Sequence, residues 1–593
     1  MSTSYSILRV DLTKGQCESE KIPEPWLKNF VGGKGLGVAY MYKELEPRTD
    51  PLSPENRLIF MLGPLSGIAP GCSRYCLVTK SPQTGAILHS YSGGFFPAEL
   101  RNALPKDHLG VIVQGRAAGL VALKIEDGSV ELVEVPGLKS KTNSEVYNHF
   151  SGFKVAAIGP AGENLVTYAT IGTDKGTHQA GRGGAGAVMG AKNLKAVVVR
   201  GERSAFAEEI KRLQKEELKR LSTSDRTQGH REGGTPRIVD MTNETGTLPT
   251  RNWTKGSFEY SENINVTAMQ RNVRKRVSCY QCPIACGFSL ELSEGAYEGL
   301  RTEKGPEYET LGMLGANLEI GDLSAVAKLS ELCNEVGIDT ISAGNVIGWV
   351  MESSERGLID YKIGFGDHEK AAELIELIAK REDIGDLVAE GTKRAAMRLG
   401  GDALGTAVEV KGLEPPAYEP RGSHSMGLAY ATSDRGACHM RAWAIGGDVF
   451  GDRDPYVAQK GHADGVIAQQ NSGSIIPDSL VCCAFAGYTI ENAVAWLNAL
   501  GYEVDEDSLA LAGERIWNLT RLFNNREGFS RKDDSLPARM QQPLQNAGPA
   551  TGKVLPTKNL EKMLDWYYEG RGWSREGVPS KEKLQSLGLD SWR

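Results

Sequence analysis

Short apolar runs dominate the first two hundred positions of the chain. Residues 7–12 alternate between apolar and polar side chains over most of their length, as a half-buried strand does. Glycine- and proline-containing turns separate the runs, so the pattern predicts a β-rich first domain. The predicted strands cover residues 7–12, 58–62, 75–79, 111–114, 121–125, 130–135, 155–158 and 196–200.

Beyond about residue 204 the apolar period changes to that of helices. Helices are predicted over 208–222, 321–336, 368–380 and 559–568, and the polar, glycine-containing stretch 223–236 is predicted to be a loop. A proline-rich seam at 413–420 marks a further boundary. The sequence therefore predicts an α+β chain with a β-rich domain (1–204) followed by two mainly α-helical domains (205–412 and 413–593).

The amino-acid composition limits the classes of protein to which this chain can belong. A chain of 593 residues is too long for one core, and 40% hydrophobic with 24% charged residues is ordinary for a globular protein. A net charge of -7 without a dominant basic face argues against nucleic-acid binding. No apolar run reaches the length of a membrane span, and the N-terminus does not resemble a signal peptide. Ten cysteines without a secretion signal indicate a reducing compartment, so we expect a cytoplasmic protein.

Three cysteines at C-x2-C-x3-C spacing, Cys279, Cys282 and Cys286, are the strongest chemical feature. On one tight turn their thiolates can converge on one centre, and an iron–sulfur cubane needs four such ligands. The adjacent Cys482 and Cys483 can supply the fourth. Radical enzymes that cleave S-adenosylmethionine usually space their cysteines three and then two, so that interpretation is weaker. A structural zinc site remains the alternative.

Three glycine tracts punctuate the β-rich region, at residues 31–37, 91–94 and 181–186. None fits the G-x-G-x-x-G fingerprint of dinucleotide-binding folds. Each can be a tight turn, or can present backbone N–H groups to an anion such as a phosphate. Because Arg74 and Arg182 add cations nearby, three tracts in one domain favour a cofactor cradle.

Several separated motifs together resemble the tungsten-containing aldehyde ferredoxin oxidoreductase family. The similarity runs in order from about residue 6 to about residue 588. The motifs are Cys279-x2-Cys282-x3-Cys286, Gly305-Pro-Glu-Tyr-Glu309, Asn334-x2-Gly337-Ile-Asp339, Arg435-Gly-Ala-Cys-His-Met-Arg441 and Asp478-x4-Cys483.

This resemblance implies tungsten, or less often molybdenum, held by the dithiolenes of two pterins without a direct protein ligand. It also implies a [4Fe-4S] cluster beside one pterin and a magnesium ion bridging the pterin phosphates. The implied cluster ligands are Cys279, Cys282, Cys286 and Cys483, the last because the family places a cysteine five positions after the aspartate. The implied pterin-side residues are Arg74, Tyr91, Ser92, Gly93, Arg182, Gly183, Gly184, Asn334, Asp339 and Asp478.

The chain departs from the family pattern at several positions. Tyr91 replaces an asparagine, Asn334 replaces an aspartate and Val481 replaces a glycine. Lys328 and Glu331 occupy the positions of an E-x2-H motif that binds a bridging iron between two subunits. The departure argues against such an iron here and leaves the dimer that it supports in doubt.

The resemblance implies oxidation of an aldehyde substrate to a carboxylic acid, with Glu309, His439 and Tyr308 as candidate catalytic residues. A buried Glu can act as a general base for water, and a His can stabilise developing negative charge. Electrons leave singly through the cluster, to ferredoxin or to an iron–sulfur or flavin partner subunit in an oligomer or hetero-complex. One alternative is a family member that reduces an aromatic acyl-CoA ring. A second is a zinc- or cluster-binding structural or electron-transfer subunit.

Overall fold

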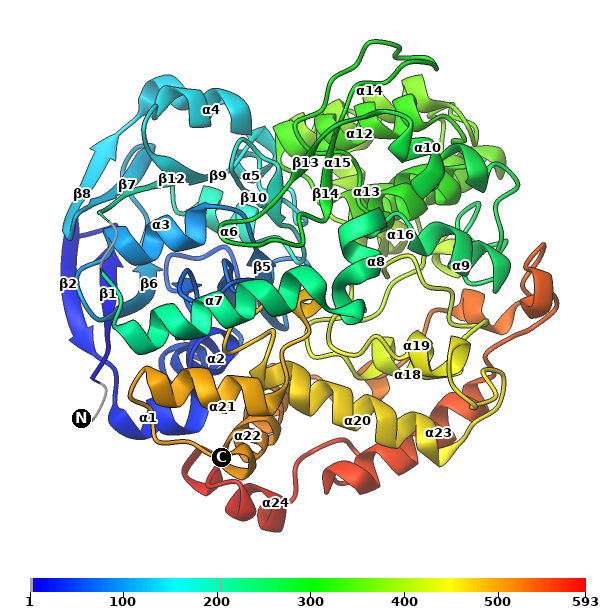
Figure 1. Cartoon of the computed structure of the whole chain (residues 1–593). Helices are drawn as coiled ribbons and strands as arrows, with labels where there is room; N and C mark the ends of the chain where they lie inside the picture. The colour runs from blue at the N-terminus through cyan, green and yellow to red at the C-terminus, as the bar shows by residue number, and fades with distance from the viewer. Residues whose placement is uncertain (1–3, 203–204, 593) are drawn as a thin grey trace.

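The protein divides into a β-rich N-terminal part and a largely helical remainder, seen in a computed structural model that describes residues 4–202 and 205–592. The blue and cyan strands gather on one side of the molecule, the green helices lie on the other, and the orange and red helices lie below (Figure 1). The predicted α+β fold class is confirmed.

The first sheet has six strands in the order β2-β1-β6-β3-β4-β5. Only β1 and β6 pair in parallel, and the other neighbours are antiparallel. Its strands are β1 (Ser6–Asp11), β2 (Gln16–Lys21), β3 (Leu58–Met61), β4 (Tyr75–Lys80), β5 (Ile87–Ser92) and β6 (His108–Gln114).

The second sheet, again of six strands, has the order β11-β10-β9-β12-β7-β8, with β12 and β7 as its parallel pair. Its strands are β7 (Val121–Glu126), β8 (Ser129–Glu134), β9 (Lys154–Ala157), β10 (Ile171–Thr173), β11 (His178–Ala180) and β12 (Leu194–Arg200). One continuous core joins the two sheets: Val111 of β6 and Val197 of β12 belong to the same buried cluster, together with Phe96 of α3 (Phe96–Ala103).

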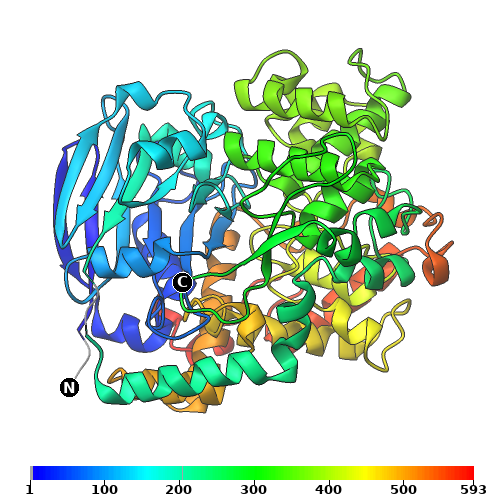
Figure 2. The same cartoon turned by 45° about the horizontal axis from the view of Figure 1, so that its top comes forward.

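Helices build the remainder of the chain, and the two-stranded β13 (Val273–Val277) and β14 (Gly287–Leu290) interrupt them. Figure 2 shows α7 running along the edge of the β-rich part before the chain enters the helical body. The longer helices are α7 (Glu208–Thr223), α12 (Leu323–Val336), α13 (Thr340–Glu355), α14 (His368–Lys380), α20 (Lys460–Ile475), α21 (Ile490–Ala499), α22 (Glu506–Arg526) and α23 (Thr557–Arg571).

Shorter helices complete the structure. In the N-terminal part they are α1 (Glu24–Phe30), α2 (Gly33–Glu44), α4 (Asn143–His149), α5 (Pro160–Glu163) and α6 (Ala185–Ala191). In the helical part they are α8 (Asp225–Gly233), α9 (Ile238–Glu244), α10 (Val266–Gln270), α11 (Tyr308–Thr310), α15 (Ile384–Val388), α16 (Thr392–Leu399), α17 (Ala403–Thr406), α18 (His424–Thr432), α19 (Ile445–Val449) and α24 (Lys581–Ser586).

The predicted loop at residues 223–236 is wrong over most of its length, because α8 occupies Asp225–Gly233. Ser224 caps this helix by accepting a hydrogen bond from the backbone N–H of Arg226. The helix carries mainly polar residues and buries only Thr227 and Gly233, so it has almost no apolar periodicity for sequence analysis to detect.

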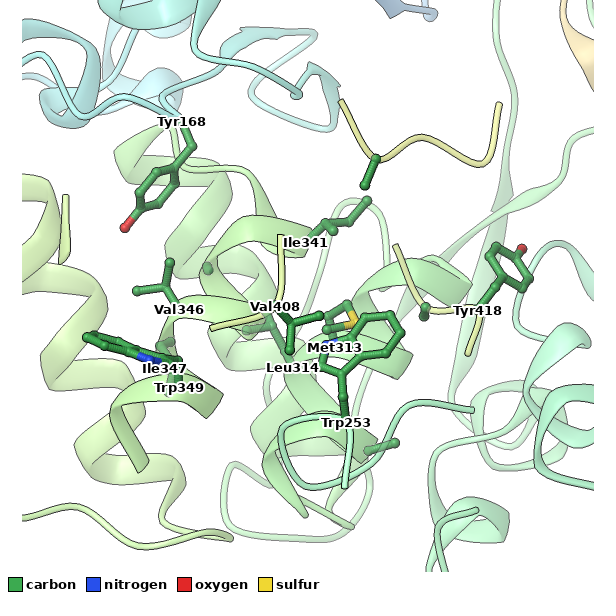
Figure 3. Close-up of a cluster of buried hydrophobic side chains, with 14 of the residues drawn as sticks. Tyr168, Trp253, Met313, Leu314, Ile341, Val346, Ile347, Trp349, Val408 and Tyr418 are labelled. Carbon is green, nitrogen blue, oxygen red and sulfur yellow. The ribbon is translucent and has the colours of Figure 1, made fainter. Parts of the chain in front are cut away.

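The largest buried cluster lies in the helical part (Figure 3). Trp253 and Trp349 are fully buried there, and the indole N–H of Trp253 donates to the side-chain oxygen of Asn345 at 2.7 Å. A buried indole needs such an acceptor, since an unpaired donor in a core is costly. Within residues 4–202 and 205–592, no helix is long and apolar enough to cross a membrane.

Candidate active site

The three cysteines of the C-x2-C-x3-C motif lie on the connection between β13 and β14. The turn is tight: the backbone N–H of Cys282 donates to the carbonyl of Cys279 at 3.1 Å, and Gln281 and Ala285 adopt positive φ angles of 51° and 45°. Two residues in the left-handed region bend the backbone back on itself. The turn therefore places Cys279, Cys282 and Cys286 on the lining of one cavity.

Cys483 joins them from almost two hundred residues away. Its backbone N–H donates to the carbonyl of Gly71 at 2.9 Å, which fixes this segment against the β-rich part. All four cysteines line one cavity of about 90 Å³. Within the described residues, no three His, Cys, Asp or Glu side chains are grouped closely enough to hold a single metal ion. Four cysteines on one cavity supply the number of thiolates that an iron–sulfur cubane needs.

The cations near the four cysteines favour the ionised, thiolate form in which these residues would act as ligands. Burial raises the pKa of Cys282 to about 12, and the neighbouring Cys483 adds to the rise. Lys304 and Arg74 line the same cavity and oppose the corresponding rise in the pKa of Cys279. Lys304 stays charged, because its partner Glu307 at 2.8 Å raises its pKa against the effect of burial. Two cations beside four thiolates reduce the cost of burying the negative charge.

A second cavity of about 250 Å³ adjoins the first. Tyr91 and Gly93 reach it from the end of β5, and Asn334 and Asp339 reach it from the junction of α12 and α13. Arg74 borders both cavities. Within the described part of the chain the Arg74 guanidinium has no hydrogen bond or ion pair. A partly buried cation without a partner fits an anionic group such as a pterin phosphate.

Arg182 and Asp339 join two sides of this cradle. Nε of Arg182 lies 3.1 Å from Oδ2 of Asp339. Asp339 in turn caps α13, since its side chain accepts hydrogen bonds from the backbone N–H groups of Ile341 and Ser342. The carboxylate is thereby fixed at the start of the helix, where it orients Arg182.

Five predicted cofactor residues, Arg182 among them, lie outside the linings of these two cavities. Ser92 uses its hydroxyl in a 3.2 Å hydrogen bond to Thr173, and Asp478 is buried in an ion pair with Arg441. Gly183 and Gly184 have φ angles of 82° and 88°. A Cβ on Gly184 would lie 2.0 Å from the carbonyl oxygen of Thr167, so this glycine is required for packing.

A third cavity, of about 640 Å³, contains the predicted catalytic residues. Tyr308, Glu309 and His439 line it together with Tyr418 and Trp443. Glu309 also borders the second cavity, and Cys483 borders the third as well as the first. Each of the three cavities therefore adjoins the other two.

Glu309 and His439 face each other in the third cavity. Oε1 of Glu309 lies 3.5 Å from Nε2 of His439 and has no hydrogen-bond partner in the described structure. Oε2 accepts a hydrogen bond from the backbone N–H of Ala417 at 2.8 Å. Burial raises the pKa of Glu309 to about 8. Burial and the nearby cations, Arg182 foremost, hold the pKa of His439 well below its usual value, so the imidazole is neutral.

Tyr308 differs from the other two candidates, because its hydroxyl donates to the carbonyl of Ala417. Burial also raises the pKa of Tyr308 well above its usual range. The same short segment thus binds both Tyr308 and Glu309, which makes Tyr308 a support for the wall of the cavity.

Sequence reasoning missed several lining residues. Tyr418 belongs to the proline-rich seam, which we interpreted only as a boundary, and its ring lies 5.6 Å from the ring of His439. Trp443 lies 6.2 Å from Tyr418, and Lys304 comes directly before the Gly305-Pro-Glu-Tyr-Glu309 motif. Only their closeness in the sequence to the family motifs could have identified Trp443 and Lys304 as lining residues.

A network of buried charged residues supports the segments that carry two of the site motifs. Nζ of Lys34 lies 2.6 Å from Asp434 and 3.4 Å from Asp478, and Asp478 also pairs with Arg441. The carboxylate of Asp434 accepts a hydrogen bond from Nε2 of His89 at 3.0 Å. These groups are far apart in the sequence, so pattern analysis could not pair them. The network connects α2 and β5 to the two segments that carry the Arg435–Arg441 and Asp478–Cys483 motifs.

Comparison with known proteins identifies the class. The family model described as "Aldehyde ferredoxin oxidoreductase, N-terminal domain" matches residues 7–201, and that described as "Aldehyde ferredoxin oxidoreductase, domains 2 & 3" matches residues 212–589. The chain is an oxidoreductase of the aldehyde ferredoxin oxidoreductase family. Membership implies a tungsten pterin and an iron–sulfur cluster, and the residues described above fit both groups.

Individual relatives cover the whole chain. It is 38% identical over 618 residues to the tungsten-containing aldehyde ferredoxin oxidoreductase of Pyrococcus abyssi, with 99% of each chain covered. It is 31% identical to the aliphatic sulfonate oxidoreductase, WOR-like subunit, of Pyrococcus furiosus, over 98% of this chain and 96% of the relative. Among solved structures it is similar to the active site complex BamBC of benzoyl coenzyme A reductase bound to 1,5-dienoyl-CoA. That chain is 28% identical, with a TM-score of 0.84, and the match covers 99% of this chain and 97% of the other.

Proposed function

We propose that this protein oxidises aldehydes to carboxylic acids, reversibly, at a tungsten bis-pterin centre. The observation that carries the proposal is the pairing of Glu309 with His439 at the meeting of the substrate-sized cavity and the arginine-containing cradle. The metal centre supplies the two-electron acceptor and a Lewis acid for the substrate oxygen. The protein has to hold the cofactor, orient the aldehyde and move protons.

Holding the pterins is assigned to residues that converge on the second cavity and its edge. Arg74 offers an unpaired guanidinium, Arg182 is oriented by Asp339, and Tyr91, Gly93 and Asn334 complete the lining. A magnesium ion between the two pterin phosphates belongs to the same proposal. The cluster is assigned to Cys279, Cys282, Cys286 and Cys483.

Proton transfer is assigned to Glu309. Oxidation of an aldehyde to an acid adds the oxygen of water to the carbonyl carbon, so water has to lose a proton. A carboxyl group with a pKa of about 8 exchanges protons readily near neutral pH, and in its ionised form it accepts that proton at Oε1. The neutral His439, 3.5 Å away, orients this oxygen. Tyr418 and Trp443 form an aromatic wall of the same cavity.

A cluster held by the four cysteines would pass electrons one at a time to the proposed acceptor, which is ferredoxin or an iron–sulfur or flavin partner subunit. The similar BamBC structure is itself a complex. Lys328 and Glu331, in place of an iron-binding E-x2-H motif, support a partner subunit over an iron-bridged dimer.

A second candidate function, reduction of an aromatic acyl-CoA ring, is favoured by one observation. The cavity of about 640 Å³ combines the rings of Tyr418 and Trp443 with Arg226 and Arg237, both exposed. An aromatic acyl group and an anionic coenzyme A tail need that combination of ring contacts and cations.

Two measurements test the proposal. Elemental analysis of anaerobically purified protein is expected to give one tungsten and about four irons per chain, without zinc. Aldehydes are then expected to reduce a viologen dye, and benzoyl-CoA is expected to be inert with reduced dye as donor. Ring reduction without aldehyde oxidation would replace the first function with the second. Zinc in place of tungsten would leave only a structural role.

A further inference from the structure

Two cysteines outside the cluster set lie in direct contact. Sγ of Cys72 is 2.7 Å from Sγ of Cys482, although 410 positions separate the two residues in the chain. Both side chains are buried. In the part of the chain that the structure describes, no other two thiols contact each other directly. Sequence analysis considered Cys482 only as a rival of Cys483 for the cluster.

The two thiols are on segments with a fixed position relative to each other. Cys72 lies between β3 and β4, and the carbonyl of its neighbour Gly71 accepts the backbone N–H of Cys483. The hydroxyl of Tyr488 donates to the carbonyl of Pro70 at 2.8 Å, so two hydrogen bonds join the segment after Cys482 to the residues just before Cys72. The sulfur–sulfur contact therefore belongs to a packed, doubly hydrogen-bonded junction.

We propose that Cys72 and Cys482 are a disulfide-forming pair. A disulfide bond is about 2.05 Å long, so the sulfurs need to approach by less than about 1 Å. The oxidant that we propose is a peroxide, because hydrogen peroxide is small enough to reach a buried thiol. One thiol loses its proton and attacks the peroxide, which gives a sulfenic acid and one water. The second thiol displaces the hydroxyl group as a second water, so two S–H bonds and one O–O bond are replaced by one S–S bond and two waters.

Formation of this bond has a consequence for the neighbouring cluster site. It ties the β3–β4 connection, which carries Arg74, covalently to the segment that carries Cys483. It also engages Cys482, so that only Cys483 remains available as the fourth thiolate at this position. The four cluster cysteines stay outside the bond. The inference depends on the contact between two thiols and is independent of the substrate proposed above.

Thiol mapping of the full-length protein tests the pair directly. Anaerobically purified protein is treated with one equivalent of hydrogen peroxide, denatured in N-ethylmaleimide and digested. Mass spectrometry is expected to find one peptide pair that joins Cys72 to Cys482, about 2 Da lighter than the two free peptides together. Reduction with a phosphine before labelling is expected to yield both residues with maleimide attached. Maleimide on both cysteines after peroxide, or a bond from Cys482 to any other cysteine, would overturn the proposal.

Three variants sharpen the assignment. Cys72→Ser is expected to leave Cys482 fully labelled, and Cys482→Ser is expected to leave Cys72 fully labelled. Cys333→Ser, which removes a buried cysteine elsewhere in the fold, is expected to retain the cross-linked peptide. Loss of the cross-link in Cys333→Ser would contradict the specific pairing. The measurement on the unsubstituted protein stands even where a variant does not fold.

Discussion

Oε1 of Glu309 lies 3.5 Å from Nε2 of His439 in the cavity that the substrate is proposed to occupy. The carboxyl group has a pKa of about 8 through burial, whereas the imidazole is neutral because burial and nearby cations lower its pKa. At pH 7 the pair therefore holds one exchangeable proton without net charge. The ionised fraction of Glu309 becomes neutral when it accepts a proton, so proton uptake creates no buried ion pair, which would be costly in this environment.

Glu309→Gln is expected to lower turnover by a factor of about 10² or more, because the amide cannot accept the proton of water. Tungsten and iron content are expected to stay at the level of the unsubstituted protein. The matched control is Glu331→Gln, since burial raises the pKa of Glu331 to about 7 and it lines none of the three cavities described. Equal turnover of Glu309→Gln and the control would remove Glu309 from the mechanism.

The pH dependence follows from the same carboxyl group. Its ionised form accepts the proton, so the active fraction rises about tenfold per pH unit below the pKa and levels off above it. kcat/KM for an aldehyde is expected to increase from pH 6 to about 8 and then reach a plateau. Dye-linked assays between pH 6 and 9.5 measure this profile, and Glu309→Gln is expected to flatten it. A profile that falls across this range would assign the opposite protonation state to the catalytic form.

We expect Cys483 to bind the cluster and the adjacent Cys482 not to bind it. Cys483→Ala removes a thiol from the four-cysteine cavity and is expected to lose iron and the EPR signal of the reduced cluster. Cys482→Ala removes a thiol that contacts Cys72 instead, and is expected to keep about four irons per chain. Iron analysis and EPR at matched protein concentration compare the two variants. Equal iron loss in both would mean that the segment, and not one sulfur, supports the cluster.

The local pattern of apolar and polar residues predicted many of the helices and strands. The strand predicted at 196–200 lies within β12, and the helix predicted at 368–380 coincides with α14. Both have the apolar periodicity that their packing requires. The helix at Asp225–Gly233 was missed because it buries almost no apolar side chain. Pattern analysis detects an element through its buried face, and α8 has almost none.

In the site, too, the sequence predicted contacts within one short segment but not contacts between distant segments. The C-x2-C-x3-C spacing correctly anticipated that Cys279, Cys282 and Cys286 line one cavity, because a tight turn is a local property. The contact between Cys72 and Cys482 depends on how distant segments pack, and nothing in the spacing of the cysteines encodes it. The hydroxyl of Tyr308, a candidate catalytic residue from its motif, donates to a backbone carbonyl that no local pattern indicated.

Lys304 offers a test of the electrostatics around the cluster that does not require the substrate to be known. It lines the four-cysteine cavity, where its charge opposes the rise in the pKa of Cys279, and it pairs with Glu307. A positive charge near a cluster stabilises the reduced state, which carries one more electron. Lys304→Gln is therefore expected to lower the midpoint potential of the cluster by roughly 50–100 mV, the size of one unit charge acting through a partly screened interior.

Lys304→Arg keeps the charge and is the matched control, with an expected shift well below that of the glutamine variant. EPR-monitored redox titration of both variants measures the difference at constant iron content. The direction is the decisive part of this prediction, because loss of the cation leaves Glu307 without its partner and adds to the negative field at the cysteines. An unchanged potential in Lys304→Gln would show that Glu307 takes up a proton when its partner is removed, so that the net charge beside the cluster stays the same. A potential that rises would contradict the role of Lys304 as a cation that stabilises the reduced cluster.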